Sequence, residues 1–401
     1  MKIRPVFQIL AALCALPLWG ASQYNLNHLA KSIAANNPAY NIELENNRSE
    51  LAQLHSENNL PDPEVEFSHL WGQDGVGNKL GVQISQSFNW PGAYKARSAA
   101  NQAEIEAKNQ LALVKQSELI MQIKQSMIDM VNARMKLDIY NQALQSIDSL
   151  SAIVERNVAK KEVSVLDGNK LRIERIAFAR KQRDAANAID QAYLQIVELN
   201  GGKPCPEIKE VLTSYPADLH LRSLETYLDD SNQFNPQLSY NRMLAKASEA
   251  NAKAISLESY PGFNVGLRHE LEDNDRFNGF IVSMSIPLFS NKGKKEAAQL
   301  TQNALTMQQQ QIKDEDASRI RKDYTIAKQL EAEIEQYGTV LNGDENLRLL
   351  KKAFDMRHIS LLDFMADLIY FTNAKADYCD LIHAYNLKLL SLERYSGLSA
   401  E

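Results

Sequence analysis

A long segment without proline constrains the fold of this chain more than any other sequence feature. It begins at Phe88-Asn89-Trp90-Pro91-Gly92, and from residue 93 to residue 203 the sequence contains no proline and only three glycines. Apolar residues between positions 120 and 158 mostly recur at steps of three and four, which is the spacing of an amphipathic or coiled-coil helix. If residues 93–160 form one helix, it is about 100 Å long at about 1.5 Å per residue, a length that no ordinary globular core requires.

The same organisation occurs twice in the chain. A second alternating apolar run leads through Pro287 into a segment that contains no further proline up to Glu401. Five pairs of landmarks keep nearly the same separation: Asn37-Pro38 and Asn235-Pro236, Leu60-Pro61 and Tyr260-Pro261, Phe88 with Gly92 and Phe289 with Gly293, Asp167 and Asp363, and Gly201 and Gly397. The spacing predicts two copies of one unit, residues 23–202 and 236–401, joined by a connector at residues 203–235.

Each copy is predicted to contain a hairpin of long helices. The first covers residues 93–199 with a break at 163–166, and the second covers residues 294–395 with a break at 357–361. Shorter helices are expected elsewhere: residues 25–35 and 41–57, and an amphipathic segment of the connector at 219–228.

Alternating residues predict a hairpin of strands in each copy. Within residues 63–88, Val65, Phe67 and His69 alternate with polar residues, and a second alternating run follows a loop of Gly, Asp and Asn. Residues 262–287 repeat the pattern around a charged tip. Each predicted strand has about the ten residues that a tilted membrane strand needs.

Composition and targeting signals favour an exported membrane protein. Residues 1–22 have the pattern of a secretory signal peptide, with Lys2 and Arg4 before an apolar centre and Gly20-Ala21-Ser22 at its end. The formal net charge of −6 argues against a nucleic-acid partner. No run of 18 apolar residues follows position 25, so strands are the remaining means of crossing a membrane.

Aromatic residues at the ends of the predicted strands support a membrane location, because amphipathic rings favour the headgroup level. They are Trp71, Trp90, Tyr94, Tyr260, Phe277 and Phe289. The alternative is that these rings fill the base of hairpins in a soluble protein. Four strands cannot close a barrel, so closure would require other subunits, and three copies would supply twelve strands around polar side chains such as Gln83, Ser85, Ser283 and Ser285.

These features in this order resemble the TolC-like outer membrane factor family, the outer-membrane efflux proteins of Gram-negative bacteria. The resemblance covers nearly the whole mature chain. The resemblance rests on the segments Asn36-Asn37-Pro38, Leu60-Pro61-Asp62-Pro63, Phe88-Asn89-Trp90-Pro91-Gly92, Ser285-Ile286-Pro287-Leu288-Phe289, and Ser360-Leu361-Leu362-Asp363 with Gly397. The Leu-Pro-Asp-Pro and Trp-Pro-Gly elements look most like the heavy-metal and cation efflux branch, which includes CusC-like and CzcC-like proteins.

The resemblance implies a mostly α fold with a β-barrel part. Three identical chains would form a twelve-stranded outer-membrane barrel on an α-helical periplasmic tunnel. The implied partners are a periplasmic adaptor (membrane fusion) protein, an inner-membrane transporter and outer-membrane lipid. The implied function is that of a passive exit duct of a tripartite efflux pump, located in the cell outer membrane and extending into the periplasm, which conducts cations, heavy metals or drugs.

Three other functions remain open at this stage. The outer-membrane component of a type I protein secretion system would have the same organisation. A periplasmic coiled-coil adaptor or structural rod would also be exported and helical, although the order of two helical hairpins and two strand hairpins disfavours it. A surface hydrolase with a helical stalk is disfavoured because no nucleophile with a matching acid–base pair stands out.

No enzyme, cofactor or metal site is predicted. Cys205 and Cys379 are expected to be unpaired thiols. The histidines are scattered without an i,i+4 pair: His28, His55, His69, His220, His269, His358 and His383. Only His383 has a cysteine one helical turn away, and two potential ligands are fewer than a fixed metal site needs.

The breaks of the two helical hairpins carry the candidate functional residues. Ser164 with Asp167 and Ser360 with Asp363 have the spacing of helix caps. The resemblance places acidic residues of the second break around the closed periplasmic aperture, which makes Asp363 a candidate gate residue. Asp367 lies one turn further on the same helix face and is the second candidate gate residue. Its counterpart in the first copy is Leu171, so Asp367 is not needed as a cap in both copies and is the better candidate for a function.

The turns themselves are predicted to form the periplasmic end that docks the adaptor, because each lies a full long helix away from its strands. The candidate docking residues are Lys160, Lys161, Arg357 and His358.

Overall fold

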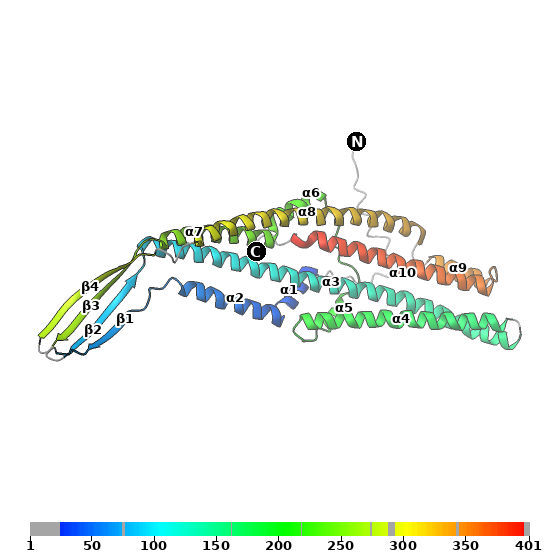
Figure 1. Ribbon diagram of the computed structural model, residues 1–401. Helices are drawn as coiled ribbons and strands as arrows, with labels where there is room; N and C mark the ends of the chain where they lie inside the picture. Colours follow the sequence, from blue (N-terminus) through cyan, green and yellow to red (C-terminus); the bar gives the residue numbers. More distant parts are fainter. Residues whose placement is uncertain are drawn as a thin grey trace, which may run out of the picture. The chain divides into compact units, whose positions relative to one another are not determined.

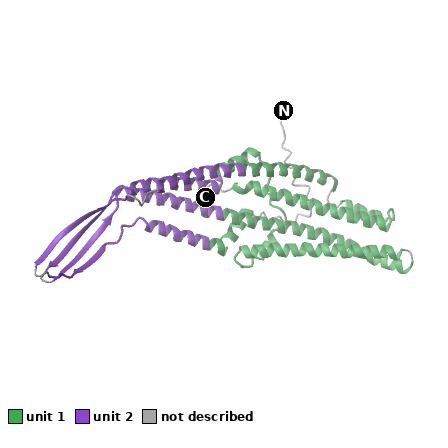
Figure 2. Cartoon of the chain, viewed as in Figure 1, with its two compact units in different colours: residues 1–41, 116–233, 317–401 green, residues 42–115, 234–316 purple. Residues whose placement is uncertain are grey.

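The computed structural model describes residues 25–73, 77–161, 163–217, 219–272, 275–287, 293–341 and 345–396. The chain forms two compact units, of which unit 1 contains residues 1–41, 116–233 and 317–401 and unit 2 contains residues 42–115 and 234–316 (Figure 2). The predicted signal peptide, residues 74–76 and 273–274 of the predicted strand tips, Phe289 and Gly397 lie outside the described residues.

The chain is mostly helical with four antiparallel strands, which confirms the predicted combination of long helical hairpins and strand hairpins (Figure 1). In order, the elements are α1 (Leu26–Ala34), α2 (Pro38–Ser56), β1 (Glu64–Leu70), β2 (Lys79–Phe88), α3 (Pro91–Ala159), α4 (Val165–Leu199), α5 (Glu207–Val211), α6 (Leu224–Phe234), α7 (Pro236–Glu258), β3 (Gly262–Glu272), β4 (Asp275–Ser285), α8 (Lys294–Leu341), α9 (Glu345–Asp355), α10 (Leu361–Leu392) and the short 3-10 helix η2 (Glu393–Tyr395). Within the described ranges, none of the helices is both long and apolar enough to span a membrane.

The proline-free segment forms one helix, α3, of 69 residues. Pro91 is its first residue, a position where the missing N–H costs nothing because the first turn has no acceptor for it. α3 contributes residues 91–115 to unit 2 and the rest to unit 1.

One helical segment differs from the sequence expectation. The connector helix expected at 219–228 is instead α6, beginning at Leu224, because the Ser223 hydroxyl accepts the Thr226 N–H and caps its first turn. The segment expected to be helical over residues 294–356 is described as α8 and α9 on either side of residues 342–344, which lie outside the described residues.

Helices of both copies share one core in unit 1. It is built from apolar side chains of α3, α4, α9 and α10: Tyr140, Ala143, Leu144, Ile147, Leu150, Val154, Leu171, Phe178, Ala185, Leu350, Phe364, Met365, Leu368 and Ala376. A second core joins α1 to α3 and α4 and includes Ile33, Ile123, Met127 and Ile196. The apolar heptad-like spacing of α3 is therefore used to pack against several helices at once.

The four strands form one sheet in the order β1-β2-β3-β4, all of it within unit 2. β1 and β2 pair as predicted, and so do β3 and β4, but β2 also pairs with β3 over ten residues, from Lys79 opposite Glu272 to Phe88 opposite Phe263. The two strand hairpins are therefore one continuous sheet, whose edges are β1 and β4.

One face of this sheet is apolar and exposed. Residues directly opposite each other in the register share a face, so Val65, Ile84, Leu267 and Phe280 form one cross-strand row. The apolar face contains Val65, Phe67, Val82, Ile84, Val265, Leu267, Phe280, Val282 and Met284, each of which is between 39% and 79% exposed. The opposite face carries Glu66, Gln83, Ser85, Arg268, Glu270 and Ser283. A contiguous apolar surface of this kind marks a contact with lipid or protein rather than with water.

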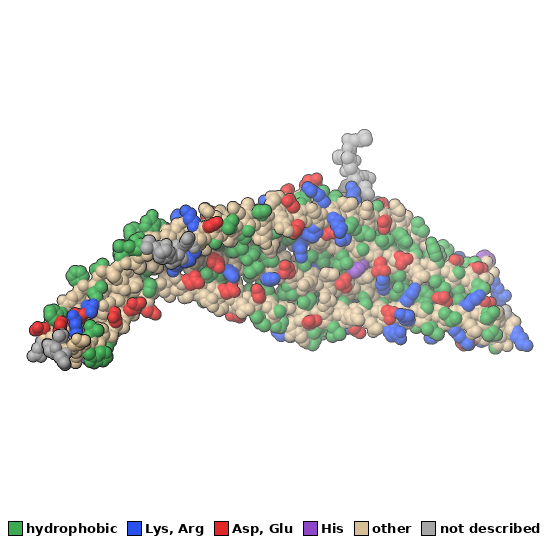
Figure 3. Space-filling model, viewed as in Figure 1, with side chains coloured by type: hydrophobic (Ala, Val, Ile, Leu, Met, Phe, Trp, Pro, Cys, Tyr) green, Lys and Arg blue, Asp and Glu red, His purple; other side chains and the backbone are tan. Residues whose placement is uncertain are grey.

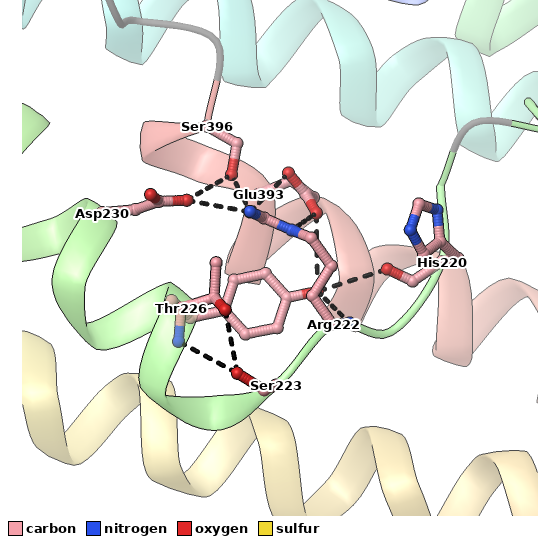
Figure 4. A network of polar contacts seen from close by, with 8 residues as sticks. His220, Arg222, Ser223, Thr226, Asp230, Glu393 and Ser396 are labelled. Carbon is pink, nitrogen blue, oxygen red and sulfur yellow. Dashed lines mark hydrogen bonds and ion pairs between the residues drawn. The ribbon is translucent and has the colours of Figure 1, made fainter.

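Arg222 anchors the connector to the C-terminal end of α10 within unit 1 (Figure 4). Its guanidinium donates to Glu393 at 2.8 Å and to Asp230 at 2.9 Å, and it lies 4.7 Å from the ring centre of the buried Tyr227. The Ser396 hydroxyl donates to the same Asp230 carboxylate. Burial works to lower the pKa of Arg222, but its hydrogen bonds to Glu393 and Asp230 outweigh burial and raise that pKa.

Replacing Arg222 with alanine should lower the free energy of unfolding by about 1–3 kcal/mol, because Asp230 and Glu393 would lose a charged donor in a half-buried place. Thermal unfolding followed by circular dichroism measures the loss. As a control, Arg180→Ala removes an exposed pair with Asp184 and should change stability by less than about 0.5 kcal/mol. Equal effects of the two substitutions would contradict the anchoring role of Arg222.

Candidate functional site at the turns of the helical hairpins

Both hairpin turns have a residue with positive φ just after the end of their first helix. In the second turn, Arg357 N–H bonds to Phe354 C=O at 2.9 Å and His358 N–H bonds to Ala353 C=O at 2.9 Å. This pair of hydrogen bonds is a Schellman motif, and it requires a left-handed residue at Arg357, whose φ is 60°. The turn therefore places Arg357 in a conformation that usually belongs to glycine.

The first turn shares the left-handed residue and one of these two hydrogen bonds. Lys161 has a φ of 61°, and its N–H bonds to Val158 C=O at 3.0 Å. Lys161 and Arg357 are the two non-glycine residues with positive φ within the described part of the chain. A left-handed conformation costs an L-residue about 1–2 kcal/mol, so both turns keep a long basic side chain at an energetic cost.

The C-terminus of α4 shows what an unstrained version of the motif looks like. There Gly201 N–H bonds to Glu198 C=O and Gly202 N–H bonds to Val197 C=O, with Gly201 at a φ of 71°. A side chain at Gly201 would also collide with the backbone oxygen of Asn36, since a Cβ there would lie 2.6 Å from it. Glycine thus occupies the packed end of α4, whereas the two hairpin turns carry Lys and Arg.

The turns are basic and exposed. The predicted docking residues Lys160, Lys161 and Arg357 are exposed, as is His358. Basic side chains gather over the end of unit 1 where α3 meets α4 (Figure 3). Beneath them the turns are held by apolar contacts, including the Phe354 and Phe364 rings at 4.8 Å between centroids. The surface can therefore meet an acidic or hydrogen-bond-accepting partner on a rigid base.

The helices after the turns begin with serine caps that differ in detail. Ser360 and Asp363 form a full capping box, in which Asp363 N–H bonds to Ser360 Oγ and Ser360 N–H bonds to the Asp363 carboxylate. Ser164 Oγ accepts the Leu166 N–H, and the Asp167 carboxylate accepts from Lys170 at 3.2 Å. Asp167 therefore contributes negative charge to the first turn of α4 and is not part of a capping box there.

The two candidate gate residues lie on one exposed face of α10. Asp363 and Asp367 are exposed, and the next exposed side chain on this face is Tyr370. Beside this face, the same turns carry the buried Phe364 and Leu368. Asp363 uses its carboxylate for the capping box, whereas Asp367 bonds to none of the described residues in the structure. The structure thus gives Asp363 a structural role and leaves Asp367 without one.

Polar links that the sequence did not point to tie α10 to the first helical hairpin, and three of them are shorter than 3 Å. Lys136 Nζ lies 2.6 Å from Asp380, His383 Nε2 lies 2.7 Å from Asp129, and Lys181 donates to the Asn373 side chain at 2.7 Å. The partners are between 192 and 254 residues apart in sequence, so no local pattern could pair them. These links fix the position of α10 relative to α3 and α4.

No group of three or more potential metal ligands occurs among the residues that the structure describes. His383, the histidine nearest to a cysteine in sequence, bonds to Asp129. Cys205 and Cys379 are not joined in a disulfide, and burial raises the pKa of the Cys205 thiol.

Comparison with known proteins identifies the fold. No protein-family model and no curated sequence matches the chain. Its structure is similar to the Campylobacter jejuni CmeC outer membrane channel, with a TM-score of 0.74 at 14% identity over 94% of this chain and 86% of that one. It is also similar to the Neisseria gonorrhoeae MtrE outer membrane channel, with a TM-score of 0.72 at 16% identity over 93% and 89%.

A third solved structure, CusC, matches with a TM-score of 0.69 at 16% identity over 92% of this chain and 91% of that one. Together these likenesses confirm the predicted fold, that of the outer membrane factor channels. The CusC match is no stronger than the other two, so the heavy-metal branch stays a prediction.

Replacing Lys161 or Arg357 with glycine should raise the free energy of unfolding by about 0.5–1 kcal/mol, because glycine adopts positive φ without strain. Thermal unfolding in detergent, followed by circular dichroism, measures the gain. The matched controls Lys160→Gly and Met356→Gly change neighbouring residues that lack positive φ and should be destabilising. Destabilisation by all four substitutions would show that the two side chains support the turns instead of straining them.

Proposed function

We propose that this chain is an outer membrane factor, the passive exit duct of a tripartite efflux pump in the outer membrane of a Gram-negative bacterium. The observation that carries the proposal is the four-stranded sheet with one apolar, exposed face and one polar face. Lipid accepts such an apolar face, whereas water does not. The likeness to solved outer membrane channels supports the same conclusion.

The duct is a trimer in this proposal. β1 and β4 pair on one side only within the chain, so each has a row of backbone groups with no partner strand. Unpaired strand edges are not tolerated in the hydrocarbon region of a membrane. Three copies joined edge to edge would supply twelve strands, with the polar face carrying Gln83, Ser85 and Ser283 turned toward the lumen. A soluble periplasmic rod would have no use for the apolar face.

The hairpin turns of unit 1 form the docking surface for a periplasmic adaptor in this proposal. The strained, basic residues Lys161 and Arg357 support it, because strain kept at an exposed position indicates selection for the side chain. The glycine substitutions described above, which should stabilise the turns, should then weaken adaptor binding. The adaptor would in turn connect the duct to an inner-membrane transporter that supplies the energy.

Asp367, with Asp363, forms the gate in this proposal. Both lie on the exposed face of α10 just after the second turn, and Asp367 has no structural partner among the described residues. Threefold symmetry would bring six carboxylates near one axis, where they repel one another and attract cations. The links from α10 to Asp129 and Lys136 would then hold the gate in the closed state.

The membrane topology can be tested by labelling with an impermeant thiol reagent in intact cells. Cysteines at Gln73 and Asp275, next to the two strand tips, should react because the tips face the exterior in the proposed topology. Cysteines at Lys160 and His358, at the opposite ends of the long hairpins, should react only after the outer membrane is permeabilised. Labelling of all four positions only after permeabilisation would exclude the proposed topology.

The gate can be tested by recording single-channel currents in planar bilayers. The wild-type channel should be cation-selective and blocked by a trivalent cation, and the double substitution Asp363→Asn and Asp367→Asn should remove the block and raise conductance. Asparagine at 363 can keep the hydrogen bonds to Ser360, so the cap is preserved. The control Asp167→Asn should keep the block and cost less than about 1 kcal/mol of stability. Loss of block only in the control would assign the gate to the first hairpin.

A further inference from the structure

A cavity of about 680 Å³ opens at the base of the sheet in unit 2. Its apolar lining comes from Leu60, Phe88, Trp90, Pro91, Tyr94 and Phe263. These residues belong to the segment before β1, the ends of β2 and β3, and the first turn of α3. Its volume lies within the range of about 300–1,000 Å³ that is usual for small-ligand pockets.

Aromatic rings give the cavity one continuous wall. Trp90 stacks on Tyr260, and their ring centroids are 5.5 Å apart. The ring centroid of Phe263 lies 6.1 Å from that of Trp90. Trp90 is nevertheless 39% exposed and Leu60 is 55% exposed, so the cavity presents apolar surface that the described residues leave uncovered.

Few polar groups face the cavity. The Gln86 side-chain amide, which lies on the apolar face of β2, donates to the Pro61 carbonyl at 2.7 Å and to the Ser87 carbonyl at 3.1 Å. The Tyr94 hydroxyl accepts the backbone N–H of Asn89 at 2.9 Å. Apart from the Tyr94 hydroxyl and the Asn89 side chain the lining is apolar, so an apolar occupant is favoured.

The position of the cavity in the sheet limits what can occupy it. Phe88 and Phe263 pair with each other on the two central strands, and they lie on the same face as Ile84, Val265 and Leu267. A second copy of the chain that adds a strand at β1 or β4 would join the sheet at an edge and leave this central position open. The cavity is instead continuous with the face that contacts lipid in the proposed function.

We propose that this cavity binds one acyl chain of a membrane phospholipid. The inference rests on the proposed function, because it takes the apolar face of the sheet to lie in the membrane. Trp90, Tyr94 and Tyr260 have the amphipathic rings that favour the headgroup level of a bilayer. A chain seated against them would run along the apolar face of β2 and β3 and cover the exposed surface of Phe88 and Leu60. A lipid held there would fix the sheet at a defined depth.

The test uses the full-length protein with Trp90 as its single tryptophan, obtained by Trp19→Phe and Trp71→Phe, since the chain has three. Phospholipid with brominated acyl chains, which quench tryptophan fluorescence on contact, is titrated into the protein in detergent. Quenching of Trp90 should saturate at one lipid per subunit. Leu60→Phe, which fills the cavity, should weaken this binding by about tenfold, the loss expected from displacing one or two methylene contacts.

A matched control separates the cavity from its surroundings. Leu70 is 59% exposed at the far end of β1, so Leu70→Phe adds the same ring away from the cavity and should leave the titration unchanged. Quenching of Trp90 that rises without saturation, or that responds equally to both substitutions, would overturn the proposal.

A second variant distinguishes failure of this proposal from failure of the proposed function. Phe280 lies on the apolar face of β4 and is 79% exposed, so Phe280→Trp, in a chain whose other tryptophans are replaced, reports on lipid contact of the sheet itself. In vesicles of brominated lipid this tryptophan should be quenched. If it is quenched while Trp90 is not, the cavity proposal is wrong and the membrane assignment stands. If neither is quenched, the membrane assignment is wrong and the cavity proposal fails with it.

Discussion

The pairing of β2 with β3 is the interaction on which the rest of unit 2 depends. It joins strands that are about 180 residues apart in the chain, with Ser85 opposite Gly266 and Phe88 opposite Phe263. Without it, the two hairpins would each be a marginal two-stranded ribbon. With it, their apolar side chains form one surface and their polar side chains another. The register also leaves room for little more than a hydrogen at Gly266, because a Cβ there would lie 2.8 Å from the Ile84 oxygen. Small residues thus permit the pairing, and the pairing defines the two faces that the proposed function uses.

In unit 1, the equivalent constraint is the shared core of the two helical hairpins. The buried side chains of α3 and α4 pack with those of α9 and α10, so neither hairpin has to bury its apolar residues alone. This core leaves the turns free to carry strained residues. Lys161 and Arg357 adopt positive φ although glycine would be less costly, and the packed end of α4 shows that this chain uses glycine where only the backbone matters. The contrast within one protein is what makes the two turns candidates for a binding surface.

The parts of the candidate site that depend on neighbouring residues could be predicted from local sequence patterns. The parts that depend on backbone strain or on contacts between distant segments could not. Ser360 with Asp363 is a cap by sequence spacing alone, because the interacting groups are three residues apart. The same spacing at Ser164 and Asp167 gave a different result, since Lys170 competes for the Asp167 carboxylate. The strain at Lys161 and Arg357 could not be predicted, because neither residue type signals a left-handed conformation. The links from His383 to Asp129 and from Lys136 to Asp380 join distant segments and required the folded structure.

The sequence by itself determined the elements: the long helices from their freedom from proline and their apolar periodicity, and the strands from their alternation. These are local properties, set by backbone sterics and by which side chains recur on one face. Repeated landmarks in the sequence also predict a duplication. Only the tertiary structure decided how the elements combine. The joining of the two hairpins into one sheet, the shared core of unit 1 and the aromatic cavity at Trp90 all depend on contacts between the two copies. Such contacts are chosen by the packing of many side chains together, which no single stretch of sequence encodes.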